Sequence, residues 1–442
     1  MIFAHTAHAA RVRGGEGGTM PAEHRRLFHR MLPAWVIIVF TSTEILAVAG
    51  PADAIDAARP RPVNGVTAHL SGPPPQLLPA SLGARKFPVP FIPYAPRVYA
   101  CAQTLTPPII DGVMDEPAWQ KAPRTEEFGD IEGSIRPTPR FHTRARMLWD
   151  DTFFYVGAEM EEPDLWATYD RRDMVIYHEN DFEVFIDPDG DTHEYYELEM
   201  NALNTAWDLL LIRPYRDGGP AVNAWDIAGL TTAVHLDGTL NDPRDRDRGW
   251  TVEIAFPWTV LAECAHRAAP PADGDQWRVN FSRVEWRIDP REGGYEKRKD
   301  PASGKALPED NWTWSPQGLV AMHYPEMWGV VQFCAAPAGT PGAAGTPSPA
   351  GTSGAAGTPS STVRPDPDAH ASWTLRLAYY AEKELFERER RYSADRLELP
   401  GFPPGPVELR VTRSGFEATL PSTDGRGTLH IRDDGRSGRT EP

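Results

Sequence analysis

Residues 144–158 read RARMLWDDTFFYVGA, and this stretch decides the class of fold. Charged and apolar side chains alternate over 144–149, Asp150 and Asp151 form a polar break, and a second apolar run follows at 153–158. Alternation with a period of two residues is typical of a half-buried strand, and two such runs around a short polar break predict a β-hairpin.

Short apolar runs of the same kind continue along the chain. They lie at 181–187, 196–201, 207–211, 250–256, 277–281 and 328–333. Pro188-Asp189-Gly190 supplies a turn after the first of them, and one short helix is expected from Trp258 to about Cys264. Many short antiparallel strands separated by turns predict an all-β main domain, folded as an antiparallel, jelly-roll-like β-sandwich.

The composition divides the 442 residues into five segments. These are a signal-peptide region (1–50), a Pro-rich tether (51–96), the β-sandwich (97–334), an Ala/Gly/Thr/Pro linker (335–371) and a small α+β module (372–432). The linker repeats Ala-Gly-Thr every six residues from Ala338, and such a segment has too few large apolar side chains to build a core. It is therefore expected to be flexible.

The small C-terminal module combines a helix with a β-meander. The predicted helix covers 373–391 with Ser372 as its N-cap, and alternating runs follow at 407–411, 416–420 and 429–431. We expect this module to dock another envelope protein.

The N-terminal region has the features of an export signal. Arg25, Arg26 and Arg30 precede an apolar run at 32–50, and Ala47-Val48-Ala49 offers a small-residue cleavage site. An uncleaved membrane anchor is the alternative, but Glu44 within the run is costly in a bilayer. The prediction is a secreted or periplasmic protein with no stable membrane span after cleavage.

Charge and cysteine content exclude several classes of protein. Lys plus Arg number 45 against 62 Asp plus Glu, a formal charge of −17, so a nucleic-acid partner is not expected. Three cysteines without CxxC spacing exclude a disulfide scaffold and a zinc-ribbon site. Cys101 precedes the first expected strand and Cys334 follows the last, which makes this pair a disulfide candidate, with two separate thiols as the alternative.

Carboxylates concentrate on two of the expected strands. Glu183 shares a strand face with Asp181, and Glu197 shares one with Glu199, so neighbouring strands would crowd like charges together. Pairing with arginine is one explanation, and the candidates are Arg144, Arg146 and Arg283. Bound calcium, a polar ligand, or a glycosidase pair of carboxylates are the others.

A second acidic group, Asp187, Asp189 and Asp191, has the spacing of a calcium loop. Its glycine stands at the fourth position instead of the sixth, and Leu198 occupies the place of the closing glutamate. A tight hairpin turn is the preferred interpretation.

Aromatic residues of the C-terminal third of the main domain suggest a sugar site. Residues 311–318 (NWTWSPQG) and 322–328 (MHYPEMW) interleave aromatic and polar side chains without a strand or helix period, which favours a binding loop. Sugars present an apolar C–H face and a rim of hydroxyls, so their sites combine flat rings with carboxylates and amides.

The main domain resembles a known family. Residues 110–119 (IDGVMDEPAW) are similar to the opening D-G-x-x-D-E-x-x-W motif of family 9 carbohydrate-binding modules, and the resemblance continues through 147–151, 181–187, 249–258 and Trp328-Gly329. It implies a noncatalytic β-sandwich that binds β-linked glucan or xylan, often with structural calcium. Such modules accompany plant-polysaccharide hydrolases.

The resemblance also implies where a sugar would bind. The clamp position before the glutamate strand is Tyr177, the ligand-binding glutamate is Glu183, and the next strand offers Glu199 and Asn201, where the family has Arg before Asn. The second clamp position falls on Met322, for which His323 or Tyr324 could substitute. The predicted carbohydrate-binding residues are Tyr177, Glu183, Glu199, Asn201, Trp312, His323 and Tyr324.

Together these features predict an extracytoplasmic, noncatalytic protein that binds β-linked plant polysaccharide or its oligosaccharides and serves polysaccharide breakdown or uptake. No cofactor is required, and structural calcium is compatible with this interpretation. A glycoside hydrolase with paired carboxylates and an envelope structural protein with a decayed sugar site are the alternatives.

Overall fold

The computed structural model describes residues 86–336, 363–393 and 407–441. The predicted signal peptide and most of the tether and linker lie outside the described residues. In the described part of the chain, no helix combines the length and the apolar character needed to cross a membrane.

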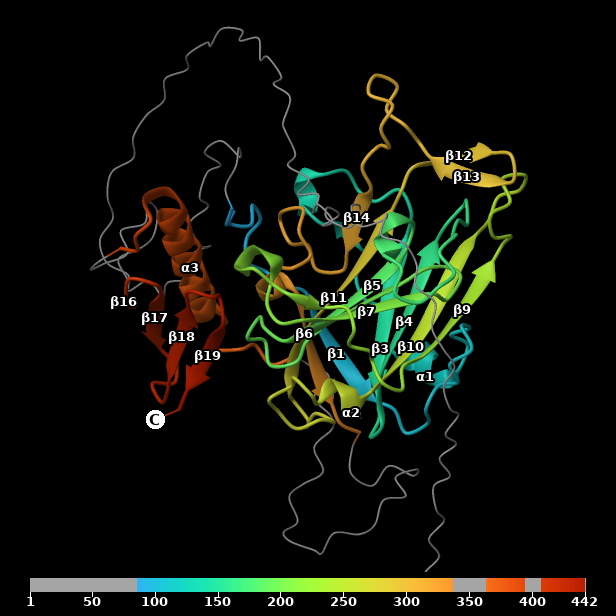
Figure 1. The fold of residues 1–442 in the computed structure, drawn as a ribbon. Coiled ribbons are helices and arrows are strands. Elements are labelled where there is room, and N and C mark those ends of the chain that lie inside the picture. The colour runs from blue at the N-terminus through green and yellow to red at the C-terminus, as the bar shows by residue number, and fades with distance from the viewer. Residues whose placement is uncertain (1–85, 337–362, 394–406, 442) are drawn as a thin grey trace, which may run out of the picture. The chain divides into compact units, whose positions relative to one another are not determined.

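A curled, mixed sheet forms the main domain (Figure 1). The strand order among the described residues is β8-β7-β6-β5-β11-β15-β1-β3-β4-β10-β9, and β14 and β2 extend it from β11. The strands are β1 (Val98–Gln103), β2 (Gly129–Asp130), β3 (Thr143–Trp149), β4 (Phe153–Glu161), β5 (Phe182–Asp187), β6 (Tyr195–Met200), β7 (Ala206–Leu211), β8 (Ala221–Val222), β9 (Thr231–Asp237), β10 (Gly249–Pro257), β11 (Gln276–Glu285), β14 (Asp310–Thr313) and β15 (Gly329–Cys334).

Short helices and one separate hairpin connect these strands. The helices are α1 (Pro117–Lys121) and α2 (Trp258–Leu261), with 3-10 turns η1 (Gly133–Ile135), η2 (Ile176–His178), η3 (Tyr215–Asp217) and η4 (Pro325–Met327). The hairpin consists of β12 (Ile288–Arg291) and β13 (Gly294–Lys297).

The hairpin at 144–158 forms as predicted. β3 and β4 pair antiparallel from Thr143 opposite Met160 to Trp149 opposite Phe154. The carboxylate of Asp150 accepts hydrogen bonds from the amides of Thr152 (2.7 Å) and Phe153 (2.8 Å), so the polar break closes the turn. The all-β class is confirmed, and the sheet is mixed because β1 pairs in parallel with both β15 and β3.

The inner faces of the two halves of the sheet enclose the main core. Apolar residues from β5, β6 and β11 meet those from β3, β4 and β10, and a cluster of aromatic rings fills one end. That cluster consists of Trp149, Phe154, Trp258, Trp277 and Phe333. Two faces thus share one buried layer, which is the arrangement of a sandwich.

The predicted disulfide is wrong. Cys101 and Cys334 are free thiols, although they lie on the neighbouring strands β1 and β15. In the register of β1 and β15, Cys101 lies opposite Phe333 and Cys334 lies opposite Ala102. The two cysteines are therefore offset by one residue along the strands. Because side chains alternate along a strand, the two thiols point to opposite faces of the sheet.

The C-terminal module consists of α3 (Ala369–Glu389) and the antiparallel strands β16 (Glu408–Val411), β17 (Phe416–Pro421), β18 (Thr428–Arg432) and β19 (Ser437–Thr440). The helix starts after Asp368, four residues before the predicted cap Ser372, and the strand β19 follows the three predicted ones. Apolar residues of α3, β17 and β18 share a cluster with Phe87, Leu319, Tyr324 and Met327 of the preceding chain.

Candidate functional site

A row of polar side chains crosses the outer face of the sheet. Glu183 on β5 lies directly opposite Glu199 on β6, as the sequence suggested for neighbouring strands. The row continues to Trp207 on β7 in one direction, and to Ser282 on β11 and Thr313 on β14 in the other. The residues between them, such as Val184, point into the main core, so this row occupies the opposite face.

Two more carboxylates join this row to form what we call the acidic cluster: Asp181, Glu183, Glu197 and Glu199. All four side chains are more than nine-tenths buried. Single carboxylate oxygens of Asp181, Glu183 and Glu199 all lie within 4.8 Å of one another. Four buried acids therefore share one small volume.

Hydrogen bonds satisfy only part of the acidic cluster. Oδ1 of Asp181 accepts a bond from the amide of Val284 (3.1 Å), and Oε2 of Glu199 accepts one from the amide of Tyr177 (2.9 Å). Oδ2 of Asp181 and Oε2 of Glu197 are buried without a hydrogen-bond partner. Buried polar atoms are rarely left in this state, so the cluster has capacity to bind something more.

Burial and mutual repulsion change the acidity of these groups. Burial raises the pKa of Glu183 to about 7. Burial, and then the charge of Glu183, raise the pKa values of Asp181, Glu197 and Glu199 well above their ordinary range. The four groups consequently cannot all be ionised at neutral pH unless positive charge is supplied.

The arginines predicted to supply that charge are engaged elsewhere. Arg144 pairs with Glu127 (2.7 Å), and Arg146 lies 3.9 Å from Glu159. Arg283 is on the core side of β11, where it pairs with Glu162 and Glu285 (both 2.9 Å). The prediction of arginine pairing is wrong, because Arg283 alternates with Ser282 and so points away from Glu183.

Exposed aromatic rings border the acidic cluster. Tyr177 on η2 is 39% exposed. Its ring stacks on that of Trp207, with 6.3 Å between the ring centres and an interplanar angle of 27°. Tyr215 on η3 is 52% exposed. Burial, and then the charges of nearby carboxylates, raise the pKa values of both tyrosines. The amide of Tyr177 donates to Glu199 (2.9 Å), which places this residue beside the cluster.

His323 lies in the loop before η4, next to Tyr215. Its Nδ1 lies 2.9 Å from the hydroxyl of Tyr195, and its ring centre is 4.5 Å from that of Tyr215. Burial, and then the charge of Arg216, lower the pKa of His323 to about 3, so the imidazole is neutral at physiological pH. The predicted residues Tyr177, Glu183 and Glu199 are thus brought together, and His323 lies beside Tyr195 and Tyr215.

Three other predicted site residues lie elsewhere. The buried amide of Asn201 donates to the carbonyl of Tyr169 and to Glu179 (both 2.7 Å). The buried ring of Trp312 faces the core side of β14, and the segment predicted as a loop is a strand there. Tyr324 is buried under Arg216, whose guanidinium lies 4.1 Å from the ring centre.

Trp207 and Tyr215 are the site residues that the sequence did not reveal. Trp207 opens a predicted strand, and its position opposite Glu199 follows only from the register of β6 and β7. Tyr215 lies in an irregular connection and carries no pattern that would have marked it.

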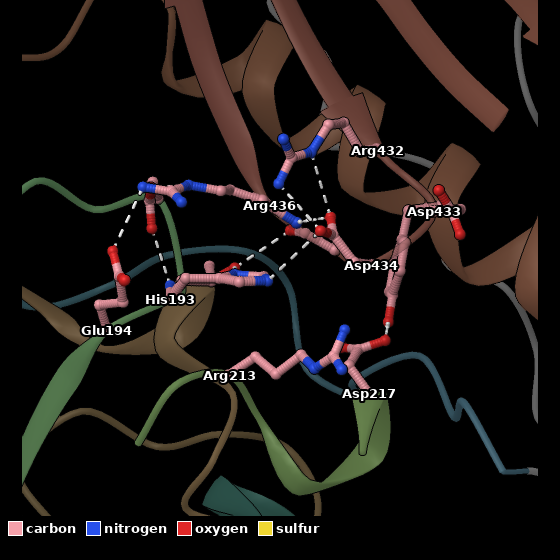
Figure 2. A network of polar contacts seen from close by, with 12 residues as sticks. His193, Glu194, Arg213, Asp217, Arg432, Asp433, Asp434 and Arg436 are labelled. Atoms are coloured by element: carbon pink, nitrogen blue, oxygen red, sulfur yellow. Dashed lines mark hydrogen bonds and ion pairs between the residues drawn. The ribbon is translucent and has the colours of Figure 1, made fainter. Parts of the chain in front are cut away.

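The second acidic group forms a hairpin turn, as preferred above. Asp187 accepts hydrogen bonds from the amides of Gly190 and Thr192 (both 2.9 Å). Arg436 of the C-terminal module contacts Asp191 and lies 3.6 Å from Glu194, while Nε2 of His193 lies 3.9 Å from Asp434 (Figure 2). These carboxylates are therefore balanced by the protein's own donors and cations.

Exposed aromatic rings beside buried carboxylates combine a flat apolar surface with groups that can form hydrogen bonds. Residues 110–277 match the family model described as "Carbohydrate family 9 binding domain-like". The resemblance of this part of the chain to family 9 carbohydrate-binding modules is thus confirmed.

Two curated relatives share 26% identity with this chain over 154 residues, or 35% of it. They are exoglucanase XynX of Acetivibrio thermocellus and endo-1,4-beta-xylanase A of Thermoanaerobacterium saccharolyticum. The matched region spans only 12% and 11% of their respective lengths.

Solved structures of similar proteins include a family 9 carbohydrate-binding module from Caldicellulosiruptor kristjanssonii in complex with cellotriose. It shares 16% identity, with a TM-score of 0.36, over 57% of this chain and 100% of that one. A putative carbohydrate-binding protein from Bacteroides uniformis shares 15% identity, with a TM-score of 0.39, over 54% of this chain and 100% of that one.

Proposed function

We propose that this protein binds β-linked plant oligosaccharides outside the cytoplasm, without cleaving them, on the face formed by Tyr177, Trp207, Tyr215 and the acidic cluster. The observation that carries the proposal is the pair of exposed tyrosines beside buried carboxylates. The rings offer a surface for the C–H face of a pyranose, and the carboxyl groups can accept or donate hydrogen bonds at its hydroxyls.

The family match supports a saccharide as the ligand, and the relatives suggest its type. Both relatives are named for enzymes of glucan or xylan breakdown, so a β-linked glucose or xylose oligomer is the first class to test. The apolar run with preceding arginines at the N-terminus supports export.

Binding is favoured over hydrolysis by the placement of the carboxylates. Glycosidases hold their two acids on opposite sides of the bond that is cleaved. Glu183 and Glu199 are instead direct cross-strand neighbours, and both side chains are buried in one wall.

The test is calorimetric titration of the full chain with cellobiose and xylobiose. We expect Tyr177→Ala to weaken binding at least tenfold, while Tyr177→Phe keeps most of it because the ring remains. Phe91→Ala is the matched control, since that ring is exposed to a similar fraction (36%) on the segment before β1. Binding that is equal in Tyr177→Ala and the native protein would contradict the proposed site, and release of reducing sugar would indicate a hydrolase.

A further inference from the structure

We propose that helix α3 of the C-terminal module holds Tyr215 in place on the binding face of the main domain, so that Tyr379 and Lys383 act as positioning residues for the saccharide. This inference rests on the proposed function, because it concerns the same face. Three sets of contacts lead to it: those of the Tyr215 ring, those of the residues that follow it in η3, and those of the segment that carries His323.

The ring of Tyr215 is linked to the acidic cluster through two other rings. Its centre lies 4.5 Å from that of the His323 ring, whose own centre lies 5.9 Å from that of Phe185. Phe185 on β5 is the cross-strand neighbour of Glu197. It also lies two residues from Glu183, so both side chains point to the same side of the sheet. Tyr215 therefore stands at one end of the acidic cluster, with 52% of its surface exposed to a ligand.

The segment that carries Tyr215 has little regular structure of its own. η3 is a three-residue 3-10 turn between β7 and β8, and β8 is a two-residue strand at the edge of the sheet. Gly218 and Gly219 follow the turn with φ values of 99° and 58°. Glycine adopts such values without strain but also adds conformational freedom to the chain. The position of Tyr215 therefore depends on contacts that come from outside η3.

Helix α3 supplies two such contacts, both to Asp217 at the end of η3. The hydroxyl of Tyr379 donates a hydrogen bond to the carboxylate of Asp217, and Nζ of Lys383 lies 3.5 Å from that carboxylate. The side chain of Asp217 has no exposed surface, and a buried carboxylate is stable in its charged form only when it is paired. Its ion pair with Arg216, at 3.3 Å, lies within η3 itself. The contacts from α3 therefore fix one end of the turn whose other end carries Tyr215.

The junction between α3 and the main domain also holds the segment that carries His323. The guanidinium of Arg216 donates to the carbonyl of His323 (3.4 Å) and pairs with Glu326 (2.9 Å). The hydroxyl of Tyr380 on α3 donates to the same carboxylate of Glu326. The ring of Tyr215 and the ring against which it packs are thus both connected to one helix, so a shift of α3 would displace both.

Hydrogen exchange of the full chain tests this role of α3 without any sugar. Tyr379→Phe removes the hydroxyl that reaches Asp217 and keeps the buried ring. We expect the amides of 215–219 to exchange at least threefold faster in this variant, and also in Lys383→Met, which removes the second contact. Tyr392→Phe is the matched control, because that buried ring packs on other rings of the C-terminal module, and it should leave the exchange unchanged. Native exchange rates in both test variants would overturn the assignment.

Calorimetric titration with cellobiose then shows whether the contact acts through Tyr215. We expect Tyr379→Phe to weaken binding at least threefold, and Tyr215→Ala to weaken it by at least the same factor, while the stacked rings of Tyr177 and Trp207 keep it measurable. In the Tyr215→Ala background, Tyr379→Phe should cause no further loss, because the ring that it positions is already absent. An equal loss in both backgrounds would overturn the assignment, since the effect would then reach the ligand by another route.

The two proposals can fail separately. Native protein that binds neither cellobiose nor xylobiose would contradict the proposed function, and hydrogen exchange would then still decide whether α3 holds η3. Native protein that binds a disaccharide, together with Tyr379→Phe protein that binds it equally well, would contradict the role of α3 and leave the proposed function standing.

Discussion

At the scale of single residues, Glu253 on β10 fixes the motif at 110–119 to the sheet. Its Oε2 accepts hydrogen bonds from the amides of Asp111 (3.0 Å) and Gly112 (2.6 Å). Its Oε1 accepts one from the indole of Trp119 (2.5 Å), and both Glu253 and Trp119 are fully buried. One carboxylate thus satisfies three donors of a segment more than 130 residues earlier in the chain.

Removing this carboxylate is expected to be strongly destabilising. Glu253→Ala leaves the three donors unpaired, and we expect the free energy of unfolding to fall by about 3–5 kcal/mol. Asp237→Ala, which removes the exposed partner of Arg248, serves as the control and should change it by less than about 1 kcal/mol. Urea denaturation of the two variants measures both values. Similar losses in the two would show that Glu253 does not anchor the motif.

Sequence motifs identified this anchor only in part. Both ends of the contact, at 110–119 and 249–253, belong to the family motifs, but nothing in the sequence joins Glu253 to Trp119. On the outer face of the sheet, the pairing of Glu183 with Glu199 agrees with the expectation from alternation for neighbouring strands. Arg283 was one of three candidate partners for the carboxylates, but it lies on the core side of β11 because neighbouring side chains of a strand point to opposite faces.

At the scale of secondary-structure elements, the start of β15 depends on a glycine. A Cβ atom on Gly329 would lie 2.4 Å from Cζ3 and 2.6 Å from Cη2 of Trp314. The ring of Trp314 is fully buried, and its centre lies 5.8 Å from that of the Phe281 ring, so it has little room to move. The Trp-Gly pair at 328–329 is therefore a packing requirement of the sheet.

Gly329→Ala should destabilise the main domain by this clash. Overpacking of a filled core costs about 1–3 kcal/mol, and we expect a value in the upper half of this range. Gly129→Ala is the matched control, because a Cβ atom on that strand residue would lie at an ordinary 3.7 Å from Pro316. Thermal denaturation measures both changes. If the two alanine variants have the same melting temperature, then the ring of Trp314 can move aside and the packing argument fails.

Elements with strong alternation were predictable, and those defined by distant partners were not. The eight predicted runs of the main domain correspond to β3, β4, β5, β6, β7, β10, β11 and β15. β14 was interpreted as a loop because only its pairing with β11 and β2, both distant in the sequence, makes it a strand. β9 was not predicted as a strand. It is an edge strand that pairs only with β10, and most of its side chains are half-buried.

At the scale of the whole molecule, the buried carboxylate of Glu326 in the main domain contacts the C-terminal module. Arg216 on η3 pairs with Glu326 on η4 at 2.9 Å, and the hydroxyl of Tyr380 on α3 donates to the same carboxylate. Arg376, also on α3, lies 3.9 Å from Glu326. The sequence predicted the helix and meander but not these contacts, because they join side chains at least fifty residues apart.

The protonation of Glu326 should make this junction sensitive to acid. Burial alone raises the pKa of Glu326, but Arg216 and Arg376 outweigh it and lower the pKa to about 2. A folded-state pKa below the ordinary value of 4.5 means that the ionised form stabilises the protein at neutral pH, and that this stabilisation is lost as the pH falls from about 4.5 towards 2.

Glu326→Gln isolates this contribution because it removes the titration and keeps the shape. We expect the native protein to be more stable than the variant by about 2–3 kcal/mol at pH 6, and the difference to shrink steadily below pH 4.5. Denaturant unfolding across this pH range, with hydrogen exchange of α3, measures it. Glu387→Gln is the control, since its exposed pair with Lys86 should contribute little at any pH. A difference that stays constant from pH 6 to pH 2.5 would mean that Glu326 does not titrate within the junction, and the ion pair would then not be what holds α3 against the main domain.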